Sequence, residues 1–197
     1  MVSQFVSPHN VTLLSDLNFH FPENIHAVGR LDNHSEGLLI LTTNKKVTRL
    51  LFQSKIAHKR TYLVQVKNQV TEESIQQLRD GVFIRIDKGQ QYKTPPCEVQ
   101  LIDDPKTFYC YDNSIKDRSP SSWLLITLTE GKYHQVRKMV ASIRHRCKRL
   151  IRVSIENLKL DDLAPGAVKE YGESEFFRFL NINDHSTVTP GAAILSS

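Results

Sequence analysis

The aliphatic run Leu38-Leu39-Ile40-Leu41 constrains the fold more than any other feature of the sequence. It is the longest uninterrupted aliphatic run in the chain, and a membrane-spanning helix needs about 20 apolar residues, so the sequence excludes transmembrane helices. A short, continuous apolar run is typical of a strand that is buried on both faces. With 197 residues, 40% of them hydrophobic, the chain is long enough to build a core around such a strand without disulfides or metals.

Strand and helix patterns follow one another in mixed order. The sequence predicts strands over 25–32 (running into a loop), 61–66, 82–86, 97–102, 123–129 and 150–155. It predicts helices that begin at Thr43 or Asn44, at Thr71 (ending at Gly81), and over 133–144. Residues 103–122 have the composition of a long loop. Because strands and helices do not alternate strictly, the α+β class is favoured.

Positive charge is concentrated in one segment. The net charge of +5 comes from 26 Lys and Arg against 21 Asp and Glu. The segment from Lys132 to Arg152 holds eight basic residues and no acidic one, and the rest of the chain carries 18 basic and 21 acidic groups. Such a local field usually faces a polyanion, most often nucleic acid. The alternative is a solvated helix face whose acidic partners lie elsewhere in the fold.

The first candidate for chemistry is Gly29-Arg30-Leu31-Asp32, followed by Ser35-x-Gly37. A carboxylate on a loop between two apolar strands is held in place yet remains accessible. The flanking glycines allow a ligand to approach the backbone closely, and Arg30 could stabilise the charge of Asp32 or contact a phosphate. The alternative is an ordinary polar turn closed by an Asx interaction.

Two further segments carry candidate residues. Tyr62, near the start of its strand, could stack on a nucleobase, or simply lie at the boundary of the core. In Glu130-Gly131-Lys132-Tyr133-His134-Gln135-Val136-Arg137-Lys138-Met139, Gly131 lets the chain turn sharply between a strand and a helix. Arg137, one turn into that helix, could reach a carboxylate of another element. The alternative is a basic surface helix.

Other classes of site have little support. The eight histidines lack HxxH and HExxH spacing, the three cysteines lack CxxC spacing, and no nucleotide-binding glycine motif occurs. We therefore expect no metal site and no disulfide scaffold, and a reducing compartment. Asp32 and Glu36 could also be interpreted as the acid/base pair of a hydrolase, which rests on spacing alone.

Three segments taken together and in order, VGRLDNHSEGLLILTTN, RTYLVQV and LTEGKYHQVRKM, resemble the catalytic-domain motifs of RNA pseudouridine synthases. The similar branch is the RsuA family (RsuA/RluB/RluE/RluF-like enzymes), which acts on ribosomal RNA. The stretch 101–128 is most similar to the RluE type, which acts on the large subunit. The resemblance implies a long, mixed and mainly antiparallel sheet with flanking helices and a central RNA-binding cleft.

The resemblance also implies an isomerase that converts uridine to pseudouridine in RNA with neither cofactor nor metal. Asp32 matches the catalytic aspartate, Tyr62 the tyrosine that stacks on uracil, and Arg137 the basic residue that pairs with the aspartate. Whether the aspartate attacks C1′ or removes a proton at C2′ stays open. The residues expected to bind RNA are Arg30, Lys132, His134, Gln135, Lys138, Leu150 and Arg152.

We expect a catalytic domain over 1–181 and a polar tail over 182–197, without the S4 RNA-binding domain of many relatives. The family's N-terminal edge strand is expected to be missing, either because the native chain starts upstream or because the fold has lost it. The expected partner is large-subunit ribosomal RNA, and the expected state is a cytoplasmic monomer. Alternatives are the same chemistry on small-subunit ribosomal RNA or tRNA, and a non-catalytic RNA-binding or ribosome-assembly protein with this fold.

Overall fold

The computed structural model describes residues 2–52, 56–111, 120–182 and 192–196. The chain divides into two compact units: unit 1 comprises residues 1–58 and 152–197, and unit 2 comprises residues 59–151. Within the described ranges, none of the helices has the length and hydropathy needed to cross a bilayer.

Strand β2 (Glu36–Thr42) is the centre of unit 1, and it contains the aliphatic run. Every residue of β2 after Glu36 is buried. Strands β1 (His26–Val28) and β11 (Ala192–Ser196) both pair antiparallel with Ile40–Thr42, so they lie on opposite sides of β2. Strand β10 (Val168–Tyr171) pairs antiparallel with β11. The predicted buried strand is therefore confirmed.

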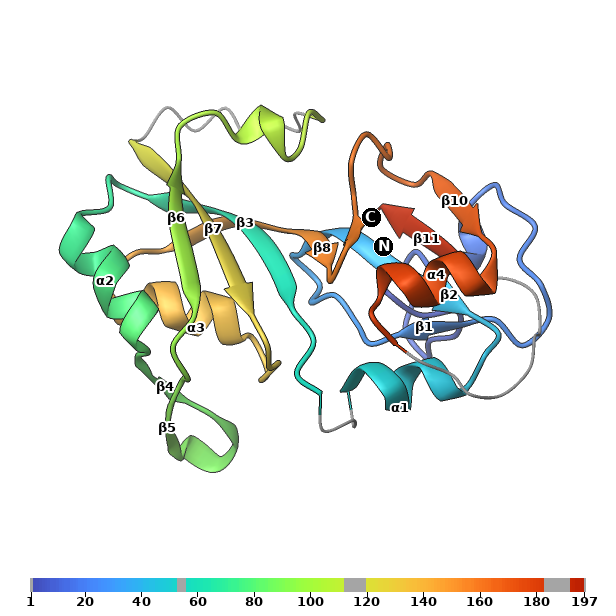
Figure 1. The fold of residues 1–197 in the computed structure, drawn as a ribbon, viewed down its shortest axis with the longest axis horizontal. Coiled ribbons are helices and arrows are strands. Elements are labelled where there is room, and N and C mark those ends of the chain that lie inside the picture. The colour runs from blue at the N-terminus through green and yellow to red at the C-terminus, as the bar shows by residue number, and fades with distance from the viewer. Residues whose placement is uncertain (1, 53–55, 112–119, 183–191, 197) are drawn as a thin grey trace. The chain divides into compact units, whose positions relative to one another are not determined.

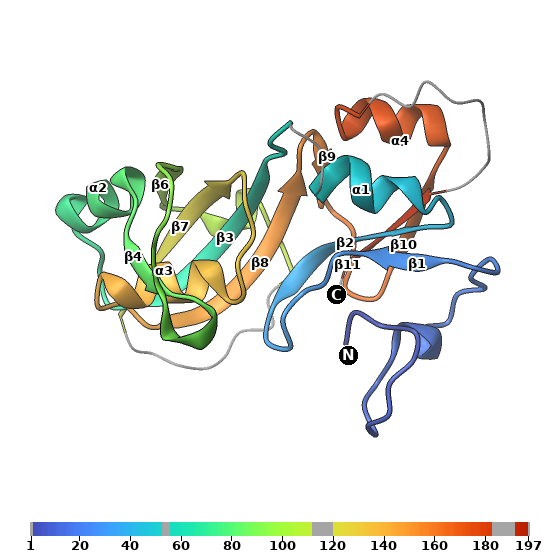
Figure 2. The same cartoon turned by 90° about the horizontal axis from the view of Figure 1, so that it is seen from below.

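Both faces of the unit 1 strands are covered, as Figure 2 shows. Helices α1 (Lys46–Phe52) and α4 (Glu173–Phe179) lie on one side, and the N-terminal segment lies on the other. Leu39 and Leu41 pack against Leu14, which belongs to the 3-10 turn Leu14–Asp16. Because side chains alternate along a strand, Leu38 and Ile40 point to the opposite face. All four residues of the run are fully buried.

Unit 2 is built on three antiparallel strands, with β7 (Ser121–Leu128) between β3 (Arg60–Lys67) and β6 (Glu98–Ile102) (Figure 1). Helices α2 (Glu72–Asp80) and α3 (Gln135–Ser142) bury their apolar sides in one core with these strands. The strands and helices of both units together confirm the α+β class with mainly antiparallel pairing.

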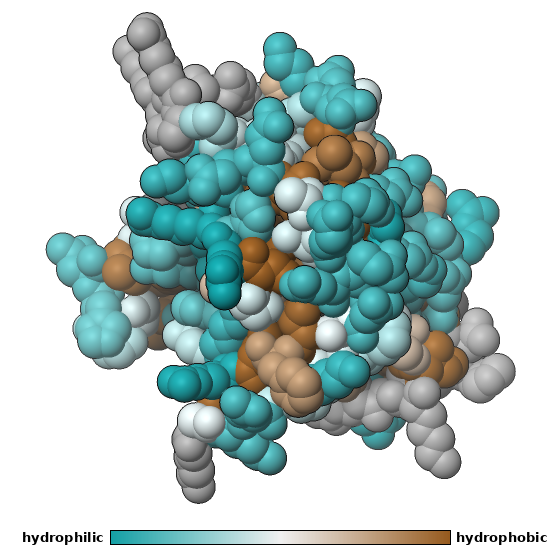
Figure 3. Space-filling model, turned by 90° about the vertical axis from the view of Figure 1, so that its left-hand side faces the viewer, coloured by the Kyte–Doolittle hydropathy of each residue, from teal (hydrophilic) through white to brown (hydrophobic). Residues whose placement is uncertain are grey.

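The other strands of unit 2 are either only three residues long or continue into unit 1. Strands β4 (Phe83–Arg85) and β5 (Gln91–Lys93) form an antiparallel hairpin with the 3-10 turn Asp87–Gly89 at its tip. Strand β8 (Cys147–Ile155) begins in unit 2 and ends in unit 1, where it pairs with β9 (Leu158–Lys159). Figure 3 shows a face on which hydrophilic side chains predominate, with hydrophobic ones between them.

Strand β11 corrects one expectation. We expect a loose polar tail over 182–197, but Ala192–Ser196 form backbone pairs with both β10 and β2. The apolar run is short and follows polar residues, so its own pattern is too weak to indicate a strand. Residues 183–191 lie outside the described residues, as do residues 112–119 of the expected long loop. The division of the chain at residue 181 stays a prediction.

Helix α2 begins and ends as its sequence predicts. The Thr71 hydroxyl accepts a hydrogen bond from the Ser74 N–H at 3.3 Å, and Gly81 ends the helix with φ at 87°. We expect Thr71→Ala to lower the free energy of unfolding by about 1 kcal/mol, because a helix N–H loses its acceptor. Urea unfolding measures this loss. The control Thr71→Ser keeps the hydroxyl, and an equal loss in both variants would contradict the explanation.

Candidate active site

The loop between β1 and β2 carries Asp32. The Ser35 N–H donates to the Asp32 carbonyl oxygen at 2.8 Å and closes a turn over residues 32–35. Asp32 is half-buried in this turn, and Arg30 is exposed. The segment can therefore be both a polar turn and the carrier of a functional carboxylate. The hydrogen bond that closes the turn uses the backbone of Asp32 and not its side chain.

Two residues near the N-terminus hold this loop. The Leu31 N–H donates to the Ser3 hydroxyl at 3.0 Å, and that hydroxyl donates to the Leu31 carbonyl at 3.4 Å. In the amide orientation that satisfies both side chains, the Gln4 oxygen accepts from Arg30 Nη1 at 3.2 Å and Nη2 at 3.3 Å. No sequence pattern indicates Ser3 or Gln4, because each lies more than 25 residues from its partner.

The glycines that flank the loop have a different use from the one expected. Gly37 has φ at 98°, and a Cβ there would lie 2.4 Å from the carbonyl oxygen of Arg152. At Gly29, with φ at 75°, a Cβ would lie 3.2 Å from the Phe52 ring. We expected room for a ligand, but the chain's own backbone and an aromatic ring occupy the space. These glycines therefore serve the packing of unit 1.

Two residues that are expected to bind RNA are internal. Arg152 is 4% exposed, and its Nε donates to the Leu38 carbonyl at 2.8 Å. Leu150 is equally buried and lies in the core of unit 2. Both residues thus have contacts within their own units, and an RNA contact for either stays a prediction.

Strand β3 presents Tyr62 and Arg60 on the same face, because they are two residues apart. Tyr62 is half-buried and packs against the core of unit 2. Arg60 is 7% exposed, and its Nη1 lies 3.6 Å from the position of a Cβ at Gly131. Arg60 thus lies under the loop that leads into α3, a position that sequence reasoning missed although Arg60 stands in the quoted motif.

Glu130 organises the loop between β7 and α3. One carboxylate oxygen accepts from Gln135 Nε2 at 2.6 Å, and the other accepts from the Tyr92 hydroxyl at 2.6 Å. The Gln135 oxygen accepts from the Lys132 N–H at 2.8 Å. Gln135 is 4% exposed, so both ends of its amide position the loop. A contact of Gln135 with RNA stays a prediction.

The sharp turn before α3 is made by His134 and not by Gly131. His134 has φ at 53° and ψ at 32°, the left-handed conformation, and α3 begins only at the next residue. The expected helix over 133–144 is therefore shorter, because a left-handed residue cannot be part of a right-handed helix. Arg137 lies in the first turn of α3 and is half-buried.

Cationic and aromatic side chains lie close to one another on this loop and on the neighbouring strand β5 and helix α3. Lys132 Nζ lies 5.1 Å from the centre of the Tyr92 ring, and Lys138 Nζ lies 5.2 Å from the centre of the Tyr133 ring. The Tyr133 and His134 rings stack with centres 3.9 Å apart, and Tyr133 is 66% exposed. Exposed rings among cations suit a single-stranded nucleic acid, whose bases stack and whose phosphates need positive charge.

The Tyr92–Glu130 contact is testable. The hydrogen bond to Glu130 is the main cause that raises the pKa of Tyr92. We expect Tyr92→Phe to destabilise the protein by about 1 kcal/mol at neutral pH. Because the raised pKa favours the protonated hydroxyl, this difference should be complete below about pH 10 and disappear as the pH rises through the raised pKa. Urea titrations of both proteins across this range measure it. A pH-independent difference would contradict this explanation, because Phe keeps the ring and lacks only the titrating hydroxyl.

The three residues that are expected to be catalytic belong to different units. Asp32 lies in unit 1, and Tyr62 and Arg137 lie in unit 2, so the pairing of Asp32 with Arg137 stays a prediction. Among the described residues, no three His, Cys, Asp or Glu side chains are grouped as a metal site would require. Cys97, Cys110 and Cys147 are free thiols, and burial raises the pKa of Cys97 to about 11.

Comparisons with known proteins agree on one family. The family model described as RNA pseudouridylate synthase matches residues 4–142. The ribosomal large subunit pseudouridine synthase E of Xanthomonas axonopodis pv. citri is 34% identical over 167 residues, which cover 84% of this chain and 85% of that protein. The protein of the same name from Vibrio vulnificus is 36% identical over 171 residues, 86% of this chain and 70% of its own length.

A solved structure gives the same result. The crystal structure of a pseudouridylate synthase superposes with a TM-score of 0.66 at 27% identity, covering 82% of this chain and 63% of that chain. The range matched by the family model includes all three segments that carry Asp32, Tyr62 and Arg137.

Proposed function

Since the chain belongs to the RNA pseudouridylate synthase family, we propose that it converts a specific uridine of large-subunit ribosomal RNA to pseudouridine. The observation that carries this proposal is the placement of Asp32, half-buried on a loop that Ser3 fixes through two hydrogen bonds to Leu31. The relatives that are 34% and 36% identical are named as synthases of the large ribosomal subunit, which supports the choice of substrate.

The reaction needs a carboxylate and an enclosed base. The bond between N1 of uracil and C1′ of ribose breaks, the uracil turns, and a bond forms between C5 and C1′, while C5 loses a proton and N1 gains one. A uracil inside a helix must first be flipped out, which costs a few kcal/mol. In this proposal Asp32 attacks C1′ or removes the proton at C2′; both roles require the partial exposure that Asp32 has.

Two other residues have roles in the same proposal. Tyr62 is half-buried with its ring against the core, so its orientation is fixed before a uracil stacks on it. Arg137 pairs with Asp32 and orients the carboxylate by charge-assisted hydrogen bonds. No cofactor or metal ion is part of the mechanism.

The substrate RNA is bound through its phosphates and bases. Lys132 and Lys138 sit beside exposed or half-buried rings, and phosphate contacts from such residues offset the cost of flipping the base. Lys132 gives a point charge and not the bidentate contact of an arginine. Arg30, which is exposed, and His134, which is half-buried, complete the set. A monomeric enzyme in a reducing cytoplasm is part of the proposal.

The experiment is pseudouridine mapping of ribosomal RNA from cells with and without the gene, by carbodiimide modification and primer extension. We expect one large-subunit stop to disappear in the deletion strain and to return with the wild-type gene but not with Asp32→Asn. A lost stop in small-subunit RNA or tRNA would assign the same chemistry to that RNA. An unchanged map of all three, with stable RNA binding by the purified protein, would favour the non-catalytic alternative.

A further inference from the structure

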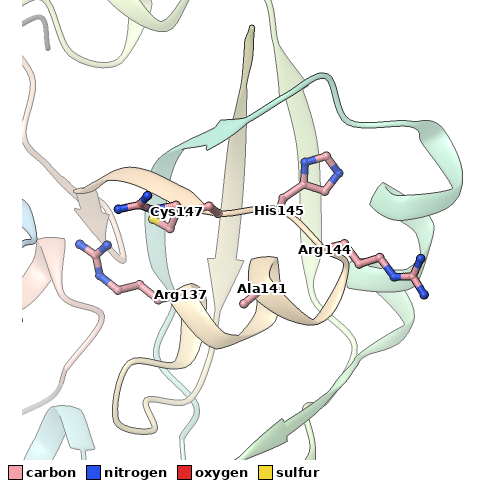
Figure 4. A pocket seen from close by; sticks show the side chains of 6 residues that line it. Arg137, Ala141, Arg144, His145 and Cys147 are labelled. Atoms are coloured by element: carbon pink, nitrogen blue, oxygen red, sulfur yellow. The ribbon is translucent and has the colours of Figure 1, made fainter. Parts of the chain in front are cut away.

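An open pocket of about 480 Å³ lies where α3 ends and β8 begins, and it is entirely within unit 2. Its lining consists of Arg137, Ala141, Arg144, His145, Arg146 and Cys147. Figure 4 shows Arg137 and Ala141 projecting from the helix, and Arg144, His145 and Cys147 along the segment that leads into β8. Three of the six residues are arginines and one is a histidine, and none has a carboxylate. The proposed function so far uses only Arg137.

The end of α3 places Arg144 in a backbone conformation that is unfavourable for a residue with a Cβ. Helix α3 ends with hydrogen bonds from the Arg144 N–H to the Ala141 carbonyl and from the His145 N–H to the Val140 carbonyl, the pattern of a Schellman cap. The residue in the left-handed position of this cap is Arg144, with φ at 63°. Glycine is the usual residue there because it has no Cβ. An arginine is therefore locally disfavoured at this position.

The segment that carries the basic groups is fixed to the end of β3. The His145 Nδ1 lies 2.9 Å from the Lys67 carbonyl oxygen, and the Lys67 N–H donates to the Arg146 carbonyl at 2.9 Å. Because a carbonyl only accepts, Nδ1 of His145 carries a proton. The backbone of residues 145 and 146 is therefore held from two sides, and the side chains project from a rigid base.

Two of the arginines in the pocket, Arg144 and Arg146, have no ion-pair partner in the part of the chain that the structure describes. Arg144 and Arg146 are exposed, and within the described ranges no carboxylate lies within 4.0 Å of either guanidinium. Cys147 is half-buried beside them; burial raises the pKa of its thiol, and the charge of Arg137 opposes that effect. Like charges that are gathered in one pocket repel one another unless an anion binds among them.

We propose that this pocket binds consecutive backbone phosphates of the substrate RNA through Arg144 and Arg146. Arg137 and Arg144 lie at opposite ends of the pocket in Figure 4, and positive charge at both ends suits a stretch of polyanion better than a single phosphate ion. The inference rests on the proposed function, because it names the RNA segment beside the modified uridine as the ligand.

The test compares a double variant, Arg144→Ala with Arg146→Ala, against a control with the same loss of charge. The control, Lys159→Ala with Lys169→Ala, removes two exposed lysines of unit 1. The probe is the large-subunit RNA fragment that contains the mapped uridine, with binding measured between about 50 and 200 mM salt, where phosphate contacts have their largest effect. Initial rates give kcat and KM, and thermal unfolding checks that each variant is folded.

We expect the double variant to bind RNA roughly 10-fold more weakly and to lose about 1 to 2 units of the slope of log Kd against log salt. Its kcat at saturating RNA should stay within about twofold, because a phosphate contact that is equal in the ground and transition states changes only KM. The control should keep the wild-type slope. A double variant that matches the control overturns the proposal, as does a fall in kcat at unchanged affinity.

A competition experiment distinguishes RNA from a free anion as the ligand of the pocket. Inorganic phosphate at constant ionic strength should compete with RNA weakly and equally in both proteins. If it competes strongly in the wild type while the double variant keeps full RNA affinity, the pocket holds a free anion and the proposal fails. A wild-type enzyme that makes no pseudouridine would refute the proposed function instead, and the salt slopes measured with total ribosomal RNA as the probe would still test the pocket.

Discussion

Asp32→Asn should lower pseudouridine formation at least about 1,000-fold while RNA binding persists, because the substitution removes the nucleophile or base and leaves the shape of the loop. The backbone hydrogen bond that closes the turn, from Ser35 N–H to the Asp32 carbonyl, does not use the carboxylate. Loss of a negative charge near RNA should leave affinity equal or slightly higher. Tritium release from C5-labelled RNA measures the rate, and filter binding measures the affinity.

Glu36→Gln is the matched control, because Glu36 is a half-buried carboxylate four residues further along the same segment. We expect it to keep activity within about 10-fold, as a residue that only supports the site. Equal losses in Asp32→Asn and Glu36→Gln would favour a mechanism with two carboxylates, and unchanged activity in Asp32→Asn would refute the assignment of the catalytic residue.

Gly37→Ala should have the largest effect on stability, at least about 3 kcal/mol, because two independent penalties coincide. Its φ of 98° disfavours any side chain, and a Cβ would lie 2.4 Å from the Arg152 oxygen and 2.8 Å from the Arg152 nitrogen. Backbone atoms in paired strands cannot move aside without loss of hydrogen bonds. Thermal unfolding should show a midpoint lower by roughly 10 °C.

Gly89→Ala separates the two penalties. Gly89 also has a left-handed φ, 77°, but a Cβ there would meet nothing within 4 Å. Gly89→Ala should therefore lower the free energy of unfolding only by the cost of the left-handed backbone, about 1–2 kcal/mol. Similar midpoints for both variants would show that the close approach to Arg152 is relieved by a small shift and costs little.

The elements that the sequence predicts well are those whose determinants are local. Thr71 and Gly81 bound α2 because a cap and a left-handed stop act within one turn. The run over 38–41 is a buried strand because four consecutive aliphatic residues cannot face water on either side. Asp32 and Tyr62 are predicted by motif, and both are half-buried.

What the sequence does not reveal depends on distant partners. The turn before α3 falls on His134 and not on Gly131, although glycine is the usual residue for such a conformation. The hydrogen bonds of Ser3 to Leu31 join residues that are 28 apart in the chain. Strand β11 exists because β2 and β10 offer backbone groups on both sides of it, which no property of its five residues indicates.

The contact of Tyr92 with Glu130 has an evolutionary consequence. The β4–β5 hairpin is joined by one hydroxyl to the carboxylate that also holds Gln135. A homologue that replaces Glu130 leaves both the tyrosine and the glutamine without an acceptor, so all three positions should be exchanged in concert across an alignment. Substitutions in the hairpin and in the loop before α3 are therefore expected to be correlated, because one carboxylate accepts from both.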